Sequence, residues 1–147
     1  MCTHFVFAWK PFLNFGKIQK EQAQIRYMQA VNQVRTEKEK LVALKEQFLQ
    51  SMNLFQESQK GLVPVERFKM FQHYFDKMKE DIRIQQNAVQ EAAQRQKECL
   101  RALEEALKNV SVVEKFRERR LQQYQLEVLA EEQKQLDEIG LQIYSRA

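Results

Sequence analysis

Residues 60–66 read Lys-Gly-Leu-Val-Pro-Val-Glu, and they interrupt a chain that otherwise contains few helix-breaking residues. Gly61 suits the left-handed position just beyond a helix, and Lys60 places a cation in the last turn of that helix. Pro64 suits the first position of a new helix, and Glu66 adds a carboxylate to its first turn. The stretch therefore predicts a helix end, a short connection and a helix start.

Long uninterrupted stretches lie on both sides of this connection. The 147-residue chain contains 3 Gly and 2 Pro, and those outside the connection stand at positions 11, 16 and 140. At ~1.5 Å per residue, the flanking helices would be roughly 65 and 110 Å long, lengths typical of coiled coils. We expect one domain with four parts: an aromatic segment over 1–16, a first helix over 17–60, a tip at 61–64 and a second helix over 65–140.

The short tip decides the architecture. A connection of about three residues forces the second helix to fold back along the first. Sandwiches, barrels and doubly wound sheets need a turn every ten residues or so, which a chain this poor in Gly and Pro cannot supply. The sequence thus predicts an all-α fold, a two-helix antiparallel coiled-coil hairpin with a longer second helix.

A regular apolar stripe supports the second helix. Alternating steps of three and four residues from Phe68 to Val113 give fourteen positions, and all are apolar except Gln85 and Gln96. Such a repeat is the a/d seam of a left-handed coiled coil. The frame then fails at Arg117 and Arg120, which indicates a four-residue insertion, a stutter that locally unwinds the supercoil. The resumed frame contains Leu121, Tyr124 and Val128.

The first helix carries a partner stripe that is less regular. Glu37 and Ser51 interrupt its frame, and towards the N-terminus Ile18, Ile25 and Met28 fit a shifted frame. The positions in the main frame are Tyr27, Ala30, Val34, Leu41, Leu44, Phe48 and Phe55.

Unequal helix lengths leave roughly residues 109–147 without a partner. We expect the N-terminal aromatics to pack on this end, near the resumed frame of the second helix. Those aromatics are Phe5, Phe7, Trp9 and Phe12.

The charges and the chemistry-bearing residues exclude several functions. The net charge is +4, but acidic and basic residues alternate along the chain, which disfavours nucleic-acid binding. The chain lacks phosphate-binding glycine loops, HExxH and GxSxG, so we expect neither catalysis nor a small-molecule substrate. The isolated residues Cys2, Cys99, His4 and His73 form no metal-ligand pattern, and we expect no metal or other cofactor. The apolar run 5–9 is far shorter than the ~20 residues of a membrane span, and no secretory signal is apparent.

Three stretches, in this order, resemble the flagellar export protein FliJ family. Residues 5–24 read FVFAWKPFLNFGKIQKEQAQ, residues 61–82 read GLVPVERFKMFQHYFDKMKEDI, and residues 112–141 read VVEKFRERRLQQYQLEVLAEEQKQLDEIGL. The resemblance covers nearly the whole chain. One departure is the Trp-Lys-Pro start at 9–11, where the family usually shows a basic and leucine-rich sequence.

The resemblance implies a central-stalk-like coiled coil of the bacterial flagellar export apparatus. It implies binding to the hexameric export ATPase and to the cytosolic domain of the membrane export gate, and a role in cycling export chaperones. It also implies a cytoplasmic protein held peripherally at the inner face of the membrane through its partners. The residues implied for the ATPase are Lys115, Arg117, Arg119, Arg120, Gln133 and Asp137, and those for the gate are Tyr74, Met78, Asp81 and Gln85.

Plainer interpretations stand beside these assignments. The basic run could be a solvated face at the stutter, and Tyr74 and Met78 could simply widen the core stripe. The chain could also be the stalk of a virulence-type secretion system, or a scaffold that dimerises through the 68–113 seam. Gene neighbours would separate the two secretion systems, and sedimentation would separate a monomeric hairpin from a dimeric scaffold.

Overall fold

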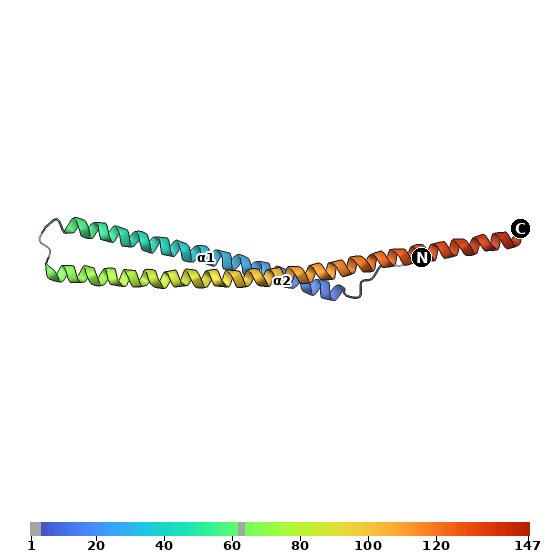
Figure 1. The fold of residues 1–147 in the computed structure, drawn as a ribbon, viewed down its shortest axis with the longest axis horizontal. Coiled ribbons are helices and arrows are strands. Elements are labelled where there is room, and N and C mark those ends of the chain that lie inside the picture. The colour runs from blue at the N-terminus through green and yellow to red at the C-terminus, as the bar shows by residue number, and fades with distance from the viewer. Residues whose placement is uncertain (1–3, 62–63) are drawn as a thin grey trace. The chain divides into compact units, whose positions relative to one another are not determined.

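The computed structural model describes residues 4–61 and 64–147, and it contains two long helices (Figure 1). Helix α1 spans Lys10–Ser58 and helix α2 spans Val65–Arg146, with 49 and 82 residues. The described residues form no strand. The expected all-α hairpin with a longer second helix is therefore confirmed. Leu62 and Val63, in the predicted tip, lie outside the described residues.

Three predicted helix boundaries are wrong. Helix α1 begins at Lys10 instead of residue 17, because Pro11 falls in the first turn, where a missing N–H costs no helical hydrogen bond. Gly16 lies inside α1, and a Cβ there would stand 3.3 Å from Cγ2 of Val110. Helix α2 likewise continues through Gly140 to Arg146. At the other end α1 stops at Ser58, whose hydroxyl donates to the carbonyl of Phe55 at 2.7 Å.

Contacts divide the chain into two compact units. One comprises Met1–Gln22 together with Glu104–Ala147, and the other is Ala23–Leu103. Each contains a piece of both helices, and each is described separately below as the terminal unit and the hairpin unit. The organisation as one domain stays a prediction.

The hairpin unit is an antiparallel pair of helices with an apolar seam. Towards its tip, the ring of Phe55 lies 4.6 Å from that of Phe71, and the ring of Phe48 lies 5.8 Å from that of Phe75. As the residue numbers on α1 fall, the numbers of their contact partners on α2 rise, which shows that the two helices run antiparallel. Every predicted α2 seam position from residue 71 to residue 103 is buried or half-buried.

The α1 stripe is more regular than the sequence suggested. In the hairpin unit its frame runs without a break from Ala23 to Phe55 and includes the polar positions Glu37 and Ser51. Ile25, which the shifted frame would bury, is exposed. The predicted frame shift is therefore wrong, and the two polar positions belong to the seam.

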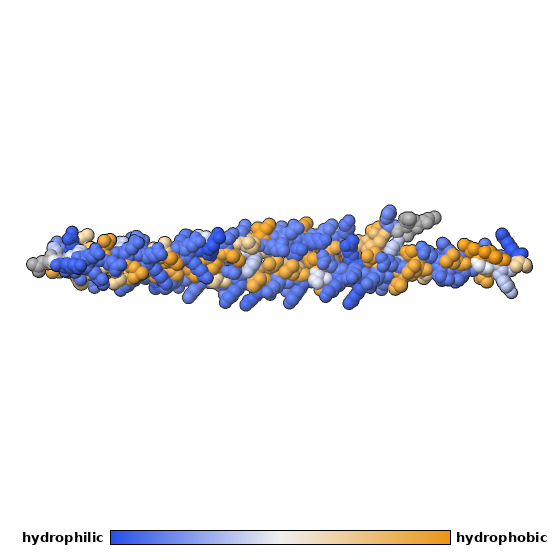
Figure 2. All heavy atoms as spheres, turned by 90° about the horizontal axis from the view of Figure 1, so that it is seen from above, coloured by the Kyte–Doolittle hydropathy of each residue, from blue (hydrophilic) through white to orange (hydrophobic). Residues whose placement is uncertain are grey.

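Both units have a thin core and a polar outer surface. Figure 2 shows hydrophilic residues over much of one face, with hydrophobic residues gathered in patches between them. The buried apolar side chains are few: Phe7, Leu13, Ala23, Val34, Met78, Ala92 and Val110. Across residues 4–61 and 64–147, neither helix contains a stretch long and apolar enough to cross a membrane.

Candidate functional site

In the terminal unit, residues 5–9 form a strap that turns at Ala8 and Trp9 and packs on α2 through aromatic rings. The ring of Phe5 lies 5.5 Å from that of Tyr124, and the ring of Phe7 lies 5.9 Å from that of Phe116. Phe7 is only 6% exposed. Trp9 makes an edge contact with Phe116 at 6.3 Å. The expected packing of the N-terminal aromatics on the C-terminal part of α2 is thus confirmed for these three residues.

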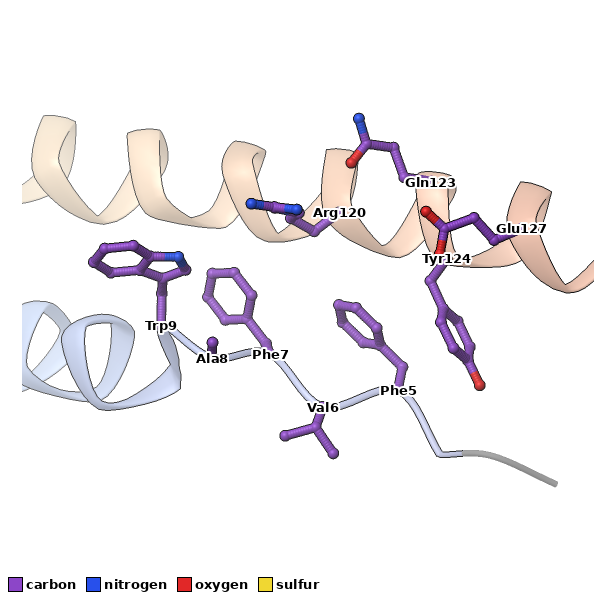
Figure 3. A pocket seen from close by; sticks show the side chains of 9 residues that line it. All are labelled: Phe5, Val6, Phe7, Ala8, Trp9, Arg120, Gln123, Tyr124 and Glu127. Atoms are coloured by element: carbon purple, nitrogen blue, oxygen red, sulfur yellow. The ribbon is translucent and has the colours of Figure 1, made fainter.

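A shallow groove of about 370 Å³ lies between the strap and α2 (Figure 3). The rings of Phe5, Phe7 and Trp9 point towards α2, whereas Val6 points away from it. Arg120 crosses the groove with its guanidinium 5.4 Å from the ring centre of Phe116, an arrangement that allows a cation–π interaction. The groove is therefore lined by aromatic rings together with one cation, Arg120, and one carboxylate, Glu127.

The predicted stutter is visible in the burial pattern of α2. Val110 and Val113 end the first frame, and Arg117 and Arg120, at the next expected seam positions, are both exposed. Because both arginines are exposed to water, neither is destabilised by the desolvation of a buried, unpaired charge. The resumed seam is half-buried at Leu121, Tyr124 and Val128, as predicted.

The basic run does not present one face. Lys115 and Arg119 stand four residues apart and share one side of α2, whereas Arg117 and Arg120 stand three apart and share another. All four are exposed, and none forms an ion pair within the described chain. The run thus offers two separate pairs of exposed cations, and one of these cations, Arg120, also lies over the ring of Phe116.

Beyond the strap, no other part of the described chain covers α2. Every residue from Leu129 to Ala147 is exposed. Leu129, Leu136 and Ile143 follow at intervals of seven, which places them on one face, and each is at least 60% exposed. Figure 2 shows hydrophobic residues towards the end where α2 terminates. An exposed apolar stripe of this kind marks a surface for a partner.

Two further residues implied for the ATPase lie on this free end. The side-chain amide of Gln133 donates to a carboxylate oxygen of Asp137 at 3.1 Å, and both side chains are exposed. Four-residue spacing makes them neighbours on the helix surface. They form a polar pair one turn apart, beside the apolar stripe.

The residues implied for the export gate lie on α2 in the hairpin unit, and two of them face the core. Met78 is 6% exposed, and Gln85 is half-buried against α1. Tyr74 is exposed, with its hydroxyl 3.4 Å from that of Ser51, and Asp81 is half-buried. The four therefore do not form one exposed strip, and only Tyr74 is broadly accessible.

The sequence analysis missed the neighbours of Tyr74. A groove of about 300 Å³ is lined by Arg67, Met70, Phe71 and Tyr74. Three of these residues, at positions 67, 70 and 74, have the three- and four-residue spacing of one helix face. Met70 is largely exposed. Apolar residues just outside the seam frame were the signal that could have identified this surface.

A polar pair occupies the centre of the hairpin seam. The amide of Gln85 donates to the backbone carbonyl of Glu37 at 2.9 Å and to its carboxylate. This hydrogen bond, assisted by Lys40 at 3.5 Å, holds the pKa of the Glu37 carboxyl below its ordinary value. Glu37 and Gln85, two of the four polar residues that interrupt the stripes, thus satisfy each other across the seam.

Metal-ligating side chains are dispersed along the described part of the chain. No three His, Cys, Asp or Glu residues there are grouped so that they could hold a metal ion. Cys99 is a free, half-buried thiol in the hairpin seam, and His73 is exposed. The surfaces described above are suited to binding other macromolecules.

Comparison with known proteins supplies the family. No curated protein matches the chain, and no solved structure matches it either. The family model described as flagellar FliJ protein matches residues 9–147, which include both helices and most of the chain. The protein therefore belongs to the FliJ family.

Proposed function

We propose that this protein is a central-stalk-like coiled coil that binds the hexameric flagellar export ATPase through the C-terminal part of α2. Membership of the FliJ family makes it a component of the flagellar export apparatus. We further propose that it binds the cytosolic domain of the export gate, takes part in cycling export chaperones, and is held at the inner face of the membrane through these partners.

The exposed C-terminal part of α2 is the observation that carries the ATPase proposal. From Leu129 onward no other part of the described chain covers this helix, although it presents an apolar stripe. In proteins most of the stability of a helix comes from tertiary packing of its apolar face, and the described chain provides no such packing for this end of α2. A protein surface that encloses the end of α2 would supply that packing, and the central pore of a ring has a suitable shape.

Arg117 and Arg120 are the residues we assign to the rim of this contact. Both are exposed, displaced from the seam by the stutter and in no ion pair within the described chain, and Arg120 also lies over the ring of Phe116. Acidic loops of the ATPase would complement them, and charge complementarity across an interface contributes mainly to specificity and association rate. Lys115, Arg119, Gln133 and Asp137 remain within the proposed ATPase surface, at its edges.

The double variant Arg117→Glu/Arg120→Glu tests the ATPase assignment. We expect at least about a tenfold loss of affinity for the purified ATPase, since reversal of two interfacial charges costs several kcal/mol. Arg26→Glu/Lys45→Glu, on exposed positions of α1, is the matched control and should bind normally. Circular dichroism should show equal helicity in both variants. Full binding by the arginine variant would refute the assignment.

The gate proposal now rests on Tyr74 and the groove around it. Tyr74→Ala should weaken binding to the gate's cytosolic domain without loss of helicity. Met78→Ala should instead lower stability, because Met78 is buried in the seam. If Tyr74→Ala binds the gate with unchanged affinity, this surface does not contact it.

The dimeric-scaffold alternative has less support. In the hairpin unit the 71–103 seam is covered by α1, so a second copy would have to displace α1. We expect the isolated protein to sediment as a monomer. A virulence-type stalk would share this fold, and the family match favours the flagellar system.

A further inference from the structure

The exposed C-terminal part of α2, in the terminal unit, carries a short heptad frame with one charged position. Alternating steps of three and four residues give the five positions of this frame, which we call the terminal stripe: Leu129, Glu132, Leu136, Ile139 and Ile143. The four apolar members are between 52% and 67% exposed, and Glu132 is exposed as well. Within the described chain Glu132 forms no ion pair. The stripe therefore has the spacing of a coiled-coil seam, and no other helix of the described chain covers it.

The terminal stripe does not continue the seam that the chain covers by itself. If the resumed frame of Leu121, Tyr124 and Val128 ran on, its next positions would be polar: Glu131, Gln135, Glu138, Gln142 and Ser145. Tyr124 meets the ring of Phe5 in the strap, and Leu129 lies about 140° further around the helix. The strap and the terminal stripe thus use different sides of α2, so a partner can cover the stripe without displacing the strap.

Glu132 is the one charged residue on this side of α2 between residues 128 and 143. The positions that border the stripe in a heptad are all uncharged: Val128, Gln133, Gln135, Gly140 and Gln142. The other charged residues of this stretch, at positions 131, 134, 137 and 138, fall at the outer heptad positions. Uncharged borders cannot select a partner through salt bridges at the edges of the stripe, which leaves that selection to Glu132.

The hairpin unit shows what a carboxylate at a seam position requires. Glu37 occupies such a position on α1, and the side-chain amide of Gln85 on α2 donates to its carboxylate. Lys40 adds an ion pair at 3.5 Å from one turn along α1. A carboxylate that is covered without such partners is strongly destabilising, because it loses its hydration without compensation. Since no basic residue stands three or four positions from Glu132, a helix that covers the terminal stripe must bring the donor itself.

A second copy of this chain does not meet that requirement. In a parallel pair of terminal stripes the two Glu132 side chains face each other, and their like charges repel. In an antiparallel pair Glu132 faces an apolar position such as Leu136 or Ile143, which offers no hydrogen-bond donor. The pattern therefore disfavours pairing between copies and favours a helix of another protein.

We propose that the terminal stripe packs against a helix of the export ATPase that carries an apolar heptad face and one hydrogen-bond donor, an amide or a cation, opposite Glu132. This inference rests on the proposed ATPase contact, and it adds the kind of segment that is bound and the residue that selects it. The apolar members of the stripe supply the buried area. Glu132 supplies the specificity, because a helix without the donor leaves the carboxylate covered and unpaired.

Substitution of Glu132 in the full-length protein, with the purified hexameric ATPase as the ligand, tests this assignment. Glu132→Leu should reduce the affinity at least about tenfold, because the donor on the ATPase is then buried without an acceptor. Glu138→Leu makes the same chemical change at an outer position, so it is the matched control and should bind like the wild type. Binding of wild-type strength by both variants would overturn the proposal and leave the ATPase contact itself in place.

Glu132→Gln distinguishes the two kinds of donor. Its amide oxygen still accepts a hydrogen bond, so an affinity close to that of the wild type indicates an amide on the ATPase. A partial loss, with a wild-type affinity that falls as salt is raised, indicates a cation. Both results support the proposal. Tighter binding by Glu132→Gln or Glu132→Leu than by the wild type would overturn it, because the carboxylate would then have no donor in the complex.

Sedimentation of the isolated proteins measures the effect of Glu132 on pairing between copies. Glu132→Leu should self-associate more strongly than the wild type, because all five stripe positions are then apolar, and Glu138→Leu should not. Unchanged self-association of Glu132→Leu would contradict the role of Glu132. Because no ATPase is present, this measurement separates the two proposals. A wild-type protein that fails to bind the ATPase refutes the proposed function, whatever the sedimentation of Glu132→Leu shows about the stripe.

Discussion

The hairpin unit and the C-terminal end of α2 use the same heptad spacing for opposite purposes. In the hairpin unit each seam position faces the other helix, including polar residues such as Glu37 and Gln85. From Leu129 to the C-terminus the apolar residues face water. The comparison shows that a regular apolar stripe predicts a face that binds another helix or protein. Whether that face is covered within the chain depends on how far α1 extends along α2.

The largest contrast should appear in stability. Phe55 meets three rings of α2, so Phe55→Ala should lower the free energy of unfolding by about 2–4 kcal/mol. Leu129→Ala should change it by less than about 0.5 kcal/mol, since the side chain is already in water. Urea unfolding followed by circular dichroism measures both. Equal losses would show that the C-terminal end has a partner within the chain.

Two glycines provide a second contrast. Gly16 lies against Val110, so Gly16→Leu should lower the free energy of unfolding by about 1–3 kcal/mol through steric overlap. A Cβ at Gly140 would meet nothing within 4 Å, so Gly140→Ala should raise stability by up to about 1 kcal/mol through helix propensity. Thermal unfolding of the two variants measures the difference. A stabilised Gly16→Leu protein would contradict the close packing.

The smallest effect should be a pH dependence centred on the hairpin seam. The hydrogen bond from Gln85 lowers the folded-state pKa of Glu37 below the ordinary 4.5. Its contribution to stability is therefore complete above pH 4.5 and is lost as the pH falls through the folded-state value.

Gln85→Leu should accordingly reduce the loss of unfolding free energy that the wild-type protein shows as the pH falls below 4.5. Gln96→Leu, which removes the other seam glutamine, is the control and should retain the wild-type slope. The measurement is the free energy of unfolding from neutral pH to values below 4.5. If the free energy of unfolding depends on pH in the same way for the wild type and for Gln85→Leu, the hydrogen bond between Gln85 and Glu37 is not the origin of the pH dependence.

Much of this fold could be predicted from the seam of α2 and the break at Gly61 and Pro64. The stutter was also predictable, because two arginines occupy expected core positions and the frame resumes four residues later. The start of α1 was not predictable, because proline and glycine usually mark the ends of helices. Pro11 is compatible with the helix because it lies in the first turn, and Gly16 lies inside the helix in contact with Val110.

The candidate sites were less predictable than the fold. Gln85 was placed at a seam position and, through the family resemblance, also among the gate-binding residues, but the sequence of one helix cannot show that it meets Glu37 on the other. Met78 was placed in the gate strip although its seam position also predicted burial. The division of the basic run into two sides of α2 follows from helical spacing, whereas the packing of the strap on Phe116 does not follow from any repeat in the sequence.

Hydrogen–deuterium exchange of the full-length protein, alone and with the hexameric export ATPase, tests the central claim most directly. Alone, amides in residues 23–103 should exchange slowly and those in 129–147 rapidly. With the ATPase, residues 112–147 should gain protection while residues 23–103 remain unchanged. Protection gained in residues 23–103 alone, or slow exchange of 129–147 in the isolated protein, would contradict a C-terminal end left free for a partner.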